Sequence, residues 1–538
     1  MPTVSEVMTD ALAAEGTQFL FGIPGGENIH FMEDARQRGI RYVLTKREGS
    51  AAFMADMVGQ LTGSPGVVLS TLGPGSTNLP NGVANAMLDR SPMLAITAQV
   101  QRHRIGTWTH QYVDHRSLFG PISKLSLTVA PESAAKVMRR AVRTAVAPRP
   151  GPVHLDLSSD VGRADTPLGP RDLVLPGDPG DRRSGQGEAA PHDVARAQRA
   201  LDRSTRPVIV AGLGAARANA QEALVHLSES RRVPVVTTAK AKGVMPEDHA
   251  LFGGVIDMAA PAVVASLLER ADCIVAIGFD AVELIKDWSF TAATIHVDEV
   301  PNTDQVYAAE IELVGDIVAI TRQLDDGKPG ASDWSEAELA DHRATIRRMM
   351  VDDSTSVGLA PHRVVMACQE ALPDDAIVTV DVGSHKLLVG QMWQSRKPNA
   401  IFQSNGLSAM GFALPGALAA QLVHPDRKVL CLTGDGGLSM SQSELEIAVE
   451  LGLPVITVVF SDGSLNRIEL KQQAAEIPST GTRTMRHHFA RVAEAYGALG
   501  IVADDPAGLE RALATALETP GPVVIEANVD PSEYAVQF

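Results

Sequence analysis

Two acidic residues stand where apolar, strand-like runs of the sequence end. Asp435 lies in the string Gly-Asp-Gly-Gly at 434–437, and Asp462 precedes Ser464 after a second apolar run. The carboxyl ends of neighbouring parallel strands meet at one sheet edge, so we expect these carboxylates to lie close together. With a carbonyl of Ser464 they would suit Mg²⁺ or Ca²⁺, and the glycines would admit a diphosphate. Alone, the string also fits a strand, an aspartate cap and a glycine turn.

Two further segments carry residues that could do chemistry. Glu48 follows a strand-like run and opens an alanine-rich helical stretch, where the helix dipole alone would favour an acid. The segment 73–78, Gly-Pro-Gly-Ser-Thr-Asn, opens another helix, either as a tight turn or as a backbone lining for a ligand. Neither segment decides the function by itself.

The elements that must position these residues have the pattern of parallel α/β sheets. Short β-branched runs alternate with helical patterns, which predicts three doubly wound parallel-sheet domains covered by helices. We expect strands at 42–44, 66–70, 93–97, 153–157, 207–212, 233–237, 273–278, 294–298, 312–315, 376–381, 428–433, 454–460 and 521–527. The domains are expected at 1–163, 191–332 and 357–538, with a linker at 164–190 and a connecting helix at 333–356.

The composition is that of a globular protein. The chain has 538 residues, 45% of them apolar, and a formal net charge of −17, which argues against a nucleic-acid surface. Cys273, Cys368 and Cys431 lack the spacing of a disulfide framework or a zinc site. We find no leader pattern and no apolar run of the roughly 20 residues that a bilayer requires. We therefore expect a cytoplasmic protein that binds no membrane and no nucleic acid.

Five motifs occur together and in order along the chain. They are Phe-Gly-Ile-Pro-Gly-Gly at 21–26, Arg-Glu at 47–48, the segments 73–78 and 406–415, and the acid pair near 435 and 462. With them, nearly the whole chain resembles the thiamine-diphosphate enzymes of the acetolactate synthase and pyruvate decarboxylase superfamily. The resemblance implies a pyrimidine-binding, a central and a diphosphate-binding domain.

The resemblance also implies roles for single residues. Glu48 would hydrogen-bond the aminopyrimidine ring of thiamine diphosphate and so help its thiazolium C2 atom to lose a proton. Met410, a core-filling residue in other settings, would hold the cofactor bent, and the Ser408 carbonyl would accept from its amino group. Asp435, Asp462 and Ser464 would hold Mg²⁺. The cofactor-binding residues would be Gly25, Gly26, Glu48, Gly73, Asn78, Gly383, Ser384, His385, Gly406, Ser408, Met410, Gly434, Asp435, Gly436, Gly437, Asp462, Ser464 and Leu465.

A His-Gln pair matches the family near its reacting carbon. Gln111 would hydrogen-bond the substrate or an intermediate, and His110 would support it. With Glu48 these are the expected catalytic residues. The plain alternative for the pair is a polar loop with a surface histidine.

Asp462 narrows the resemblance further, because most of the family has Asn at this position. Ser-Asp-Gly-Ser-Leu-Asn at 461–466 resembles the catabolic acetolactate synthases that work without FAD, and the central segments 276–283 and 312–317 agree. The resemblance therefore implies no flavin. The lone Gly-x-Gly at 212–214 is assigned to a turn.

The segment after Asn466 departs from the catabolic synthases. In relatives it helps to close the active site and to shape the acceptor pocket, so the acceptor is left open. Lys471 and Arg483 in this segment would bind a carboxylate or be solvated, and we favour solvation for each.

Together these features imply an enzyme that decarboxylates a 2-oxo acid, with pyruvate as the first candidate, and ligates the product to a second carbonyl. The alternatives are a non-ligating decarboxylase, another acyl-transferring or lyase member, and a non-catalytic structural or regulatory homologue. The last is disfavoured because Glu48, Asp435 and Asp462 are all present. The partners would be the 2-oxo acid and a carbonyl acceptor, in a homodimer or homotetramer with active sites at the subunit interface.

Overall fold

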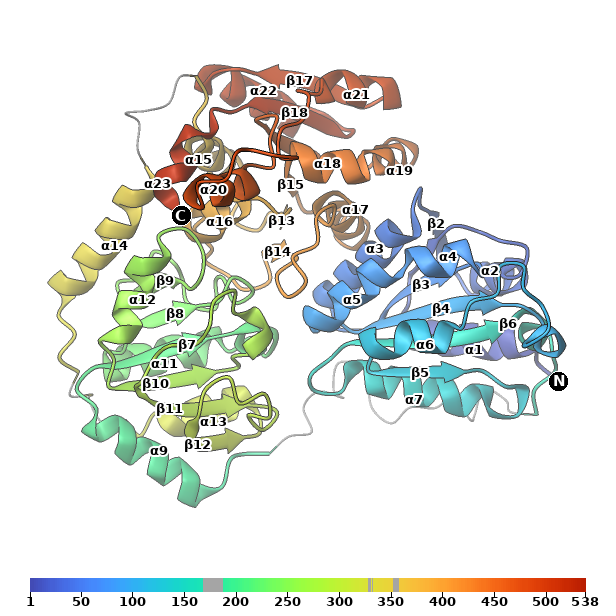
Figure 1. Cartoon of the computed structure of the whole chain (residues 1–538). Coiled ribbons are helices and arrows are strands. Elements are labelled where there is room, and N and C mark those ends of the chain that lie inside the picture. Colours follow the sequence, from blue (N-terminus) through green and yellow to red (C-terminus); the bar gives the residue numbers. More distant parts are fainter. Residues whose placement is uncertain (168–186, 328–329, 331, 352–357) are drawn as a thin grey trace. The chain divides into compact units, whose positions relative to one another are not determined.

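The computed structural model describes residues 1–167, 187–327, 330, 332–351 and 358–538, coloured along the chain in Figure 1. These residues form two units. Unit 1 contains residues 1–167, 407–424 and 441–450, and unit 2 contains the rest. Unit 1 holds one six-stranded sheet and unit 2 holds two.

The sheet of unit 1 is fully parallel, with strand order β2-β1-β3-β4-β6-β5. Its central strands are buried along their whole length, as expected for a sheet covered on both faces. The strands are β1 (Phe19–Gly22), β2 (Arg41–Leu44), β3 (Gly66–Ser70), β4 (Met93–Gln99), β5 (Leu125–Thr128) and β6 (Pro152–Ser158). The helices are α1 (Val4–Ala14), α2 (Ile29–Gln37), α3 (Glu48–Thr62), α4 (Pro74–Asn78), α5 (Pro80–Leu88), α6 (His115–Phe119), α7 (Ala134–Val146) and α8 (Ser159–Gly162).

The second sheet, in unit 2, has the order β12-β11-β10-β7-β8-β9. Its strands are β7 (Pro207–Ala211), β8 (Val235–Thr237), β9 (Phe252–Val255), β10 (Cys273–Ile277), β11 (Ala293–Asp298) and β12 (Ala309–Val314). Its helices are α9 (Pro191–Arg203), α10 (Leu213–Arg217), α11 (Gln221–Arg231), α12 (Pro261–Glu269), α13 (Ile317–Leu324) and α14 (Glu336–Met350). The side chain of Ser335 caps α14 by accepting from the N–H of Glu338.

The third sheet has the order β14-β13-β15-β16-β18-β17 and is also parallel. Its strands are β13 (Ile377–Val380), β14 (Ile401–Gln403), β15 (Val429–Gly434), β16 (Ile456–Ser461), β17 (Leu499–Ala503) and β18 (Val523–Asn528). Its helices in unit 2 are α15 (Pro361–Ala371), α16 (Ser384–Met392), α18 (Asp435–Ser441), α20 (Asn466–Ala474), α21 (Phe489–Tyr496), α22 (Pro506–Glu518) and α23 (Tyr534–Gln537). Within unit 2, one buried cluster runs from Val208 of the second sheet to Val380 of the third.

Helices α17 (Ala413–Val423) and α19 (Leu445–Leu451) complete the chain, and α17 packs on α3 within unit 1. Within the described ranges, no helix is both long and apolar enough to cross a membrane.

The three parallel α/β sheets confirm the predicted fold class. All thirteen predicted strands are present, although β12 begins at Ala309 and not near 312. The sequence does not reveal β1, β5, β9, β14 and β17, which are three to five residues long. β1 lies next to a sheet edge and the other four are edge strands, of which β5 and β17 are half-exposed. The predicted linker at 164–190 falls largely on 168–186, outside the described residues, and the predicted domain boundaries remain predictions.

Candidate cofactor and substrate site

Asp435 and Asp462 follow two neighbouring strands, β15 and β16, which are paired in parallel. Asp435 Oδ1 accepts from the N–H of Gly436, and its Oδ2 accepts from the N–H of Gly463, each at 2.7 Å. The loop that carries Asp462 is therefore tied to the carboxylate of Asp435. The two acids lie at one sheet edge, as the sequence predicts.

The electrostatics of this pair fit a cation. Asp462 Oδ1 accepts from the N–H and the hydroxyl of Ser464, at 2.7 and 2.9 Å. Burial, and then the negative charge of Asp435, raises the pKa of Asp462 to about 7, and burial also raises the pKa of Asp435. A divalent cation would offset this repulsion. Among the described residues, no three His, Cys, Asp or Glu side chains cluster as a metal site, so other ligands would be carbonyl, water or ligand oxygens.

The glycines beside Asp435 allow Asp381 and His385 to pack closely against the backbone of this edge. A Cβ at Gly437 would lie 2.7 Å from Cγ of Asp381, and one at Gly434 would lie 3.1 Å from Cε1 of His385. His385 is buried and stacks on Phe460, with ring centroids 5.1 Å apart. Burial lowers the pKa of His385 to about 3, so the ring is neutral. Its Nε2 has no hydrogen-bond partner among the described residues, while the ring also hydrogen-bonds the backbone of Asp381.

Three further predicted residues of unit 2 lie at helix starts or in a turn. Ser384 begins α16 after Gly383, and its hydroxyl donates to Oδ1 of Asn466 at 2.7 Å. Gly406 is half-buried in the turn after β14. Leu465 stands before α20, and its N–H donates to the carbonyl of Thr482 at 2.7 Å.

Glu48 begins α3 in unit 1 and is buried. One carboxylate oxygen, Oε2, accepts from Nδ2 of Asn78 at 3.0 Å. A Cβ at Gly75 would lie 3.3 Å from the other oxygen. Burial, and then the charge of Glu48, raises the pKa of Tyr42. The segment 73–78 thus positions the Glu48 carboxylate, a relation that the separate motifs do not reveal.

The loop glycines of unit 1 make close contacts. Gly73 has φ +55°, and a Cβ there would lie 2.8 Å from Cβ of Gln111, which itself has φ +58°. A Cβ at Gly25 would overlap Thr71, whereas one at Gly26 would meet nothing within 4 Å. Position 73 therefore has no room for a side chain beside Gln111, and its positive φ also favours glycine.

The turn that carries Met410 belongs to unit 1 and precedes α17. Ser408 has φ +53° and Gly411 has φ +85°. Two residues after Met410, Phe412 packs edge-on against Phe53 of α3, with centroids 5.8 Å apart. Unit 1 therefore anchors this turn on the helix that Glu48 begins.

A buried network that no motif indicates lies beneath the segment 73–78. His115 Nε2 lies 2.7 Å from Ser76 Oγ, and its Nδ1 lies 3.0 Å from Oδ1 of Asp156. Thr97 Oγ1 lies 3.0 Å from His115 Nδ1 and 2.9 Å from Nε2 of His154. All five side chains are buried, so Ser76 presents no accessible nucleophile. The network instead fixes the position of the segment.

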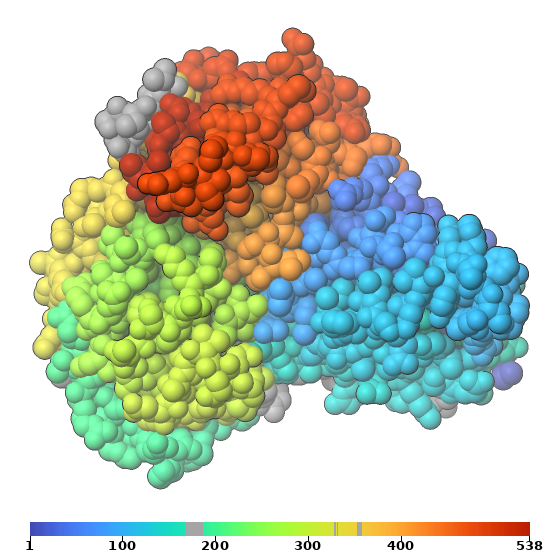
Figure 2. Space-filling view, viewed as in Figure 1, coloured from blue at the N-terminus to red at the C-terminus, as the bar shows by residue number. Residues whose placement is uncertain are grey.

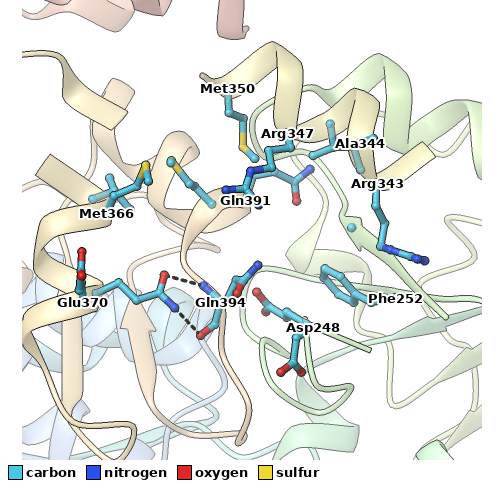
Figure 3. Close-up of a pocket in the computed structure, with 16 residues that line it drawn as sticks. Asp248, Phe252, Arg343, Ala344, Arg347, Met350, Met366, Glu370, Gln391 and Gln394 are labelled. Atoms are coloured by element: carbon cyan, nitrogen blue, oxygen red, sulfur yellow. Dashed lines mark hydrogen bonds between the residues drawn. The ribbon is translucent and has the colours of Figure 1, made fainter. Parts of the chain in front are cut away.

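A cavity of about 360 Å³ in unit 1 gathers Gly26, His110 and Gln111, the residues that the sequence places near the substrate. Unit 2 has a separate cavity of about 650 Å³ between α14, α15 and α16, drawn in Figure 3. Gln369 and Gln394 exchange two hydrogen bonds on its wall. None of the predicted site residues lines the second cavity.

The segment after Asn466 returns to the acid pair. The N–H of Thr484 donates to the carbonyl of Gly463 at 2.9 Å. Arg483 is not merely solvated, because it is paired with the buried carboxylate of Glu469 at 2.7 Å, while Lys471 is exposed. In the space-filling view, α20 and the residues after it form part of the surface of unit 2 (Figure 2).

Three family models of the thiamine pyrophosphate enzymes match the chain in order. The model of the N-terminal TPP-binding domain matches residues 2–118, that of the central domain matches 194–324, and that of the C-terminal TPP-binding domain matches 381–527. The chain belongs to the thiamine pyrophosphate enzyme family. The range matched by the C-terminal model contains Asp435 and Asp462, and the range matched by the N-terminal model contains Glu48 and Gln111.

Relatives in this family match nearly the whole chain. A probable acetolactate synthase large subunit of Methanocaldococcus jannaschii is 31% identical, over 98% of this chain and 92% of its own length. The acetolactate synthase of Bacillus subtilis is 30% identical over 98% of this chain and 93% of its own. A catabolic acetolactate synthase of Raoultella terrigena is 31% identical over 98% and 95%. The chain is thus a thiamine pyrophosphate enzyme that is similar to acetolactate synthases along its length.

Proposed function

We propose that the protein uses thiamine diphosphate and Mg²⁺ to decarboxylate a 2-oxo acid and to join the remaining fragment to a second carbonyl. Pyruvate is the first candidate donor, because the relatives that match nearly the whole chain are acetolactate synthases. The observation that carries the proposal is the largely buried pair Asp435 and Asp462 on two hydrogen-bonded loops beside a glycine-rich strand end, which suits a metal diphosphate.

Bound thiamine diphosphate would supply the carbon nucleophile and the electron sink for loss of CO₂. Glu48, held by Asn78, would share a proton with the pyrimidine ring, because its carboxylate is buried and its other oxygen faces Gly75. Asp435, Asp462 and the Ser464 carbonyl would hold the cation.

His385, which is buried beside Gly434, would line the diphosphate side of the site. Gln111 would orient the substrate, with His110 beside it on the cavity wall. We propose Met410 as the apolar support for the bent cofactor.

We propose that the protein binds no FAD. In the second sheet, Glu283 follows β10, and its carboxylate reaches the turn after β7. There its Oε2 accepts from the N–H of Leu213 at 2.9 Å, and its Oε1 accepts from the hydroxyl of Thr238. A Cβ at Gly212 would lie 2.6 Å from Oε2 of Glu283. A buried carboxylate at this place disfavours a dinucleotide phosphate. Purified protein should carry no flavin absorbance, and bound flavin would refute this part.

We further propose a cytoplasmic homodimer or homotetramer in which the partner subunit's Glu48 completes each site. Cys273, Cys368 and Cys431 are buried free thiols, which suits a reducing compartment. Dilution below the dissociation constant should abolish activity, so a fully active monomer would contradict the oligomer.

The activity is tested by incubating the protein with pyruvate, thiamine diphosphate and Mg²⁺ and identifying the products by mass spectrometry. Acetolactate is the expected product. Release of free acetaldehyde without acetolactate would show that the protein is a non-ligating decarboxylase and not a ligase. No Mg²⁺-dependent binding of thiamine diphosphate in calorimetry would favour a non-catalytic homologue.

A further inference from the structure

The cavity of about 360 Å³ in unit 1 contains charged residues that no motif of the sequence singles out. Besides Gln111 and His110, it is lined by Arg104 and Arg163. Its volume lies in the range of pockets for small organic molecules. In an acidic protein, arginines without acidic partners in a pocket require an explanation.

Arg104 is held in place by an aromatic ring. Its guanidinium carbon lies 4.7 Å from the centroid of the Trp108 ring, and the N–H of Trp108 donates to the Arg104 carbonyl at 2.8 Å. Stacking covers one guanidinium face and leaves the N–H groups at its edge for an oxyanion in the same plane. Within the described ranges, Arg104 has no carboxylate partner.

Arg163 is the second positive group of the cavity. It follows α8, and its Nη1 lies 3.4 Å from Nε2 of His30, which also lines the cavity. In the part of the chain that the structure describes, Arg163 pairs with no carboxylate. Arg102 behaves differently, because its Nε lies 2.9 Å from Oδ2 of Asp160 and it does not line the cavity.

One acid, Glu27, lines the same cavity. Its Oε2 accepts from the hydroxyl of Thr71 at 2.7 Å. The lining therefore carries two guanidinium groups against one carboxylate. The net charge of the chain is −17, so such a local excess of positive charge is what an anionic ligand would need.

We propose that this cavity binds a 2-oxo acid whose side chain ends in a second anionic group, a carboxylate, a phosphonate or a sulfonate. The inference rests on the proposed function, which places the reacting carbon near His110 and Gln111. Those two residues attend the reacting end of the substrate, and Arg104 and Arg163 bind the distal anion through charge-assisted hydrogen bonds. The preferred donor is thus longer and more acidic than pyruvate, which would also be turned over but with a lower kcat/KM.

The test compares kcat/KM for pyruvate with that for oxaloacetate, 2-oxoglutarate, 3-phosphonopyruvate and 3-sulfopyruvate, which distinguishes the three distal groups. The wild-type protein should prefer at least one of the four over pyruvate by about tenfold or more, the usual effect of a charged hydrogen bond. Arg104→Ala and Arg163→Ala should raise KM for that substrate by a similar factor with little change in kcat. For pyruvate the change should stay below about threefold.

The matched control is Arg102→Ala, which removes an arginine of the same loop that is already paired and lies outside the cavity. This variant should leave kcat and KM unchanged for pyruvate and for the substrates with a distal anion. Arg104→Lys should restore part of the affinity, because it keeps the charge and loses the planar fork. Equal losses for pyruvate and the dianionic substrates, or a wild-type preference for pyruvate, would overturn the proposal.

Binding of an inert anion separates this inference from the proposed reaction. Succinate should raise the thermal unfolding midpoint of the wild-type protein more than propionate does, and Arg104→Ala should lose that difference. A succinate effect without turnover of any 2-oxo acid would support the anionic site and count against the reaction. Turnover of pyruvate without a succinate effect would overturn the anionic site alone.

Discussion

His115 Nε2 lies 2.7 Å from the hydroxyl of Ser76, and that hydroxyl lies 2.9 Å from the carbonyl of Gly73. On the other side of the ring, Asp156 is within hydrogen-bond distance of Nδ1. The chain of contacts therefore runs from a buried carboxylate to the segment whose last residue, Asn78, donates to Glu48. His115 positions that segment without itself contacting Glu48.

Replacing His115 by Phe should loosen this segment. The ring would fill the space, but the Asp156 carboxylate would lose its donor, which costs about 1–3 kcal/mol for a buried polar group. Hydrogen exchange in peptides that cover 73–78 should accelerate by roughly tenfold or more. His103→Phe, at an exposed position of the neighbouring loop, is the control and should change nothing. Unchanged exchange in His115→Phe would show that the network does not hold the segment.

His154 should make unit 1 sensitive to acid. Burial, and then the charges of His115 and Arg116, lowers the pKa of His154 to about 3. In the unfolded chain His154 binds a proton near pH 6.5, whereas in the folded chain it does not. The contribution of His154 to the free energy of unfolding is therefore complete above pH 6.5 and falls toward pH 3. The loss is about 1.4 kcal/mol for each pH unit in that window. Calorimetric unfolding at pH 7 and pH 5 should show a smaller difference for His154→Gln, and an equal difference would refute this origin.

Asp435 and Asp462 should not contribute equally to cofactor binding. Asp435 receives two backbone N–H groups and ties the two loops together, so Asp435→Asn should weaken Mg²⁺-dependent binding of thiamine diphosphate by about tenfold or more. Asp462→Asn keeps an oxygen ligand and removes one of two repelling charges, so its effect should stay within a few-fold. Isothermal calorimetry with and without Mg²⁺ measures both. A larger loss for Asp462→Asn would reverse the assignment.

The packing of Phe412 should affect both the stability of unit 1 and the position of the turn that carries Met410. Phe412 and Phe53 are buried and packed edge-on at 5.8 Å, so Phe412→Leu should lower stability by about 1–2 kcal/mol. Because the ring anchors the Met410 turn on α3, the affinity for thiamine diphosphate should fall as well. Phe538→Leu, at the half-buried C-terminus, is the comparison variant and should leave that affinity unchanged.

The central strands of all three sheets were predictable, because a parallel strand buried on both faces reads as a continuous apolar run. β5 and β17 were not, since each is half-exposed and lies at a sheet edge where the apolar run breaks down. The Asp435 and Glu48 motifs were visible because their residues are adjacent in sequence. The His115 network and the Arg104 and Arg163 pair were not visible, because each joins residues about 40 to 60 positions apart without any period.

The central claim is that a thiamine-diphosphate site acts on 2-oxo acids with the help of Glu48. The most direct measurement is CO₂ release from 2-oxo acids, with and without thiamine diphosphate and Mg²⁺, for the wild-type protein and for Glu48→Gln. We predict release that requires both additions and falls by about 100-fold or more in Glu48→Gln, with calorimetric cofactor binding largely retained. Release that is independent of the cofactor, or equal in Glu48→Gln, would contradict the account.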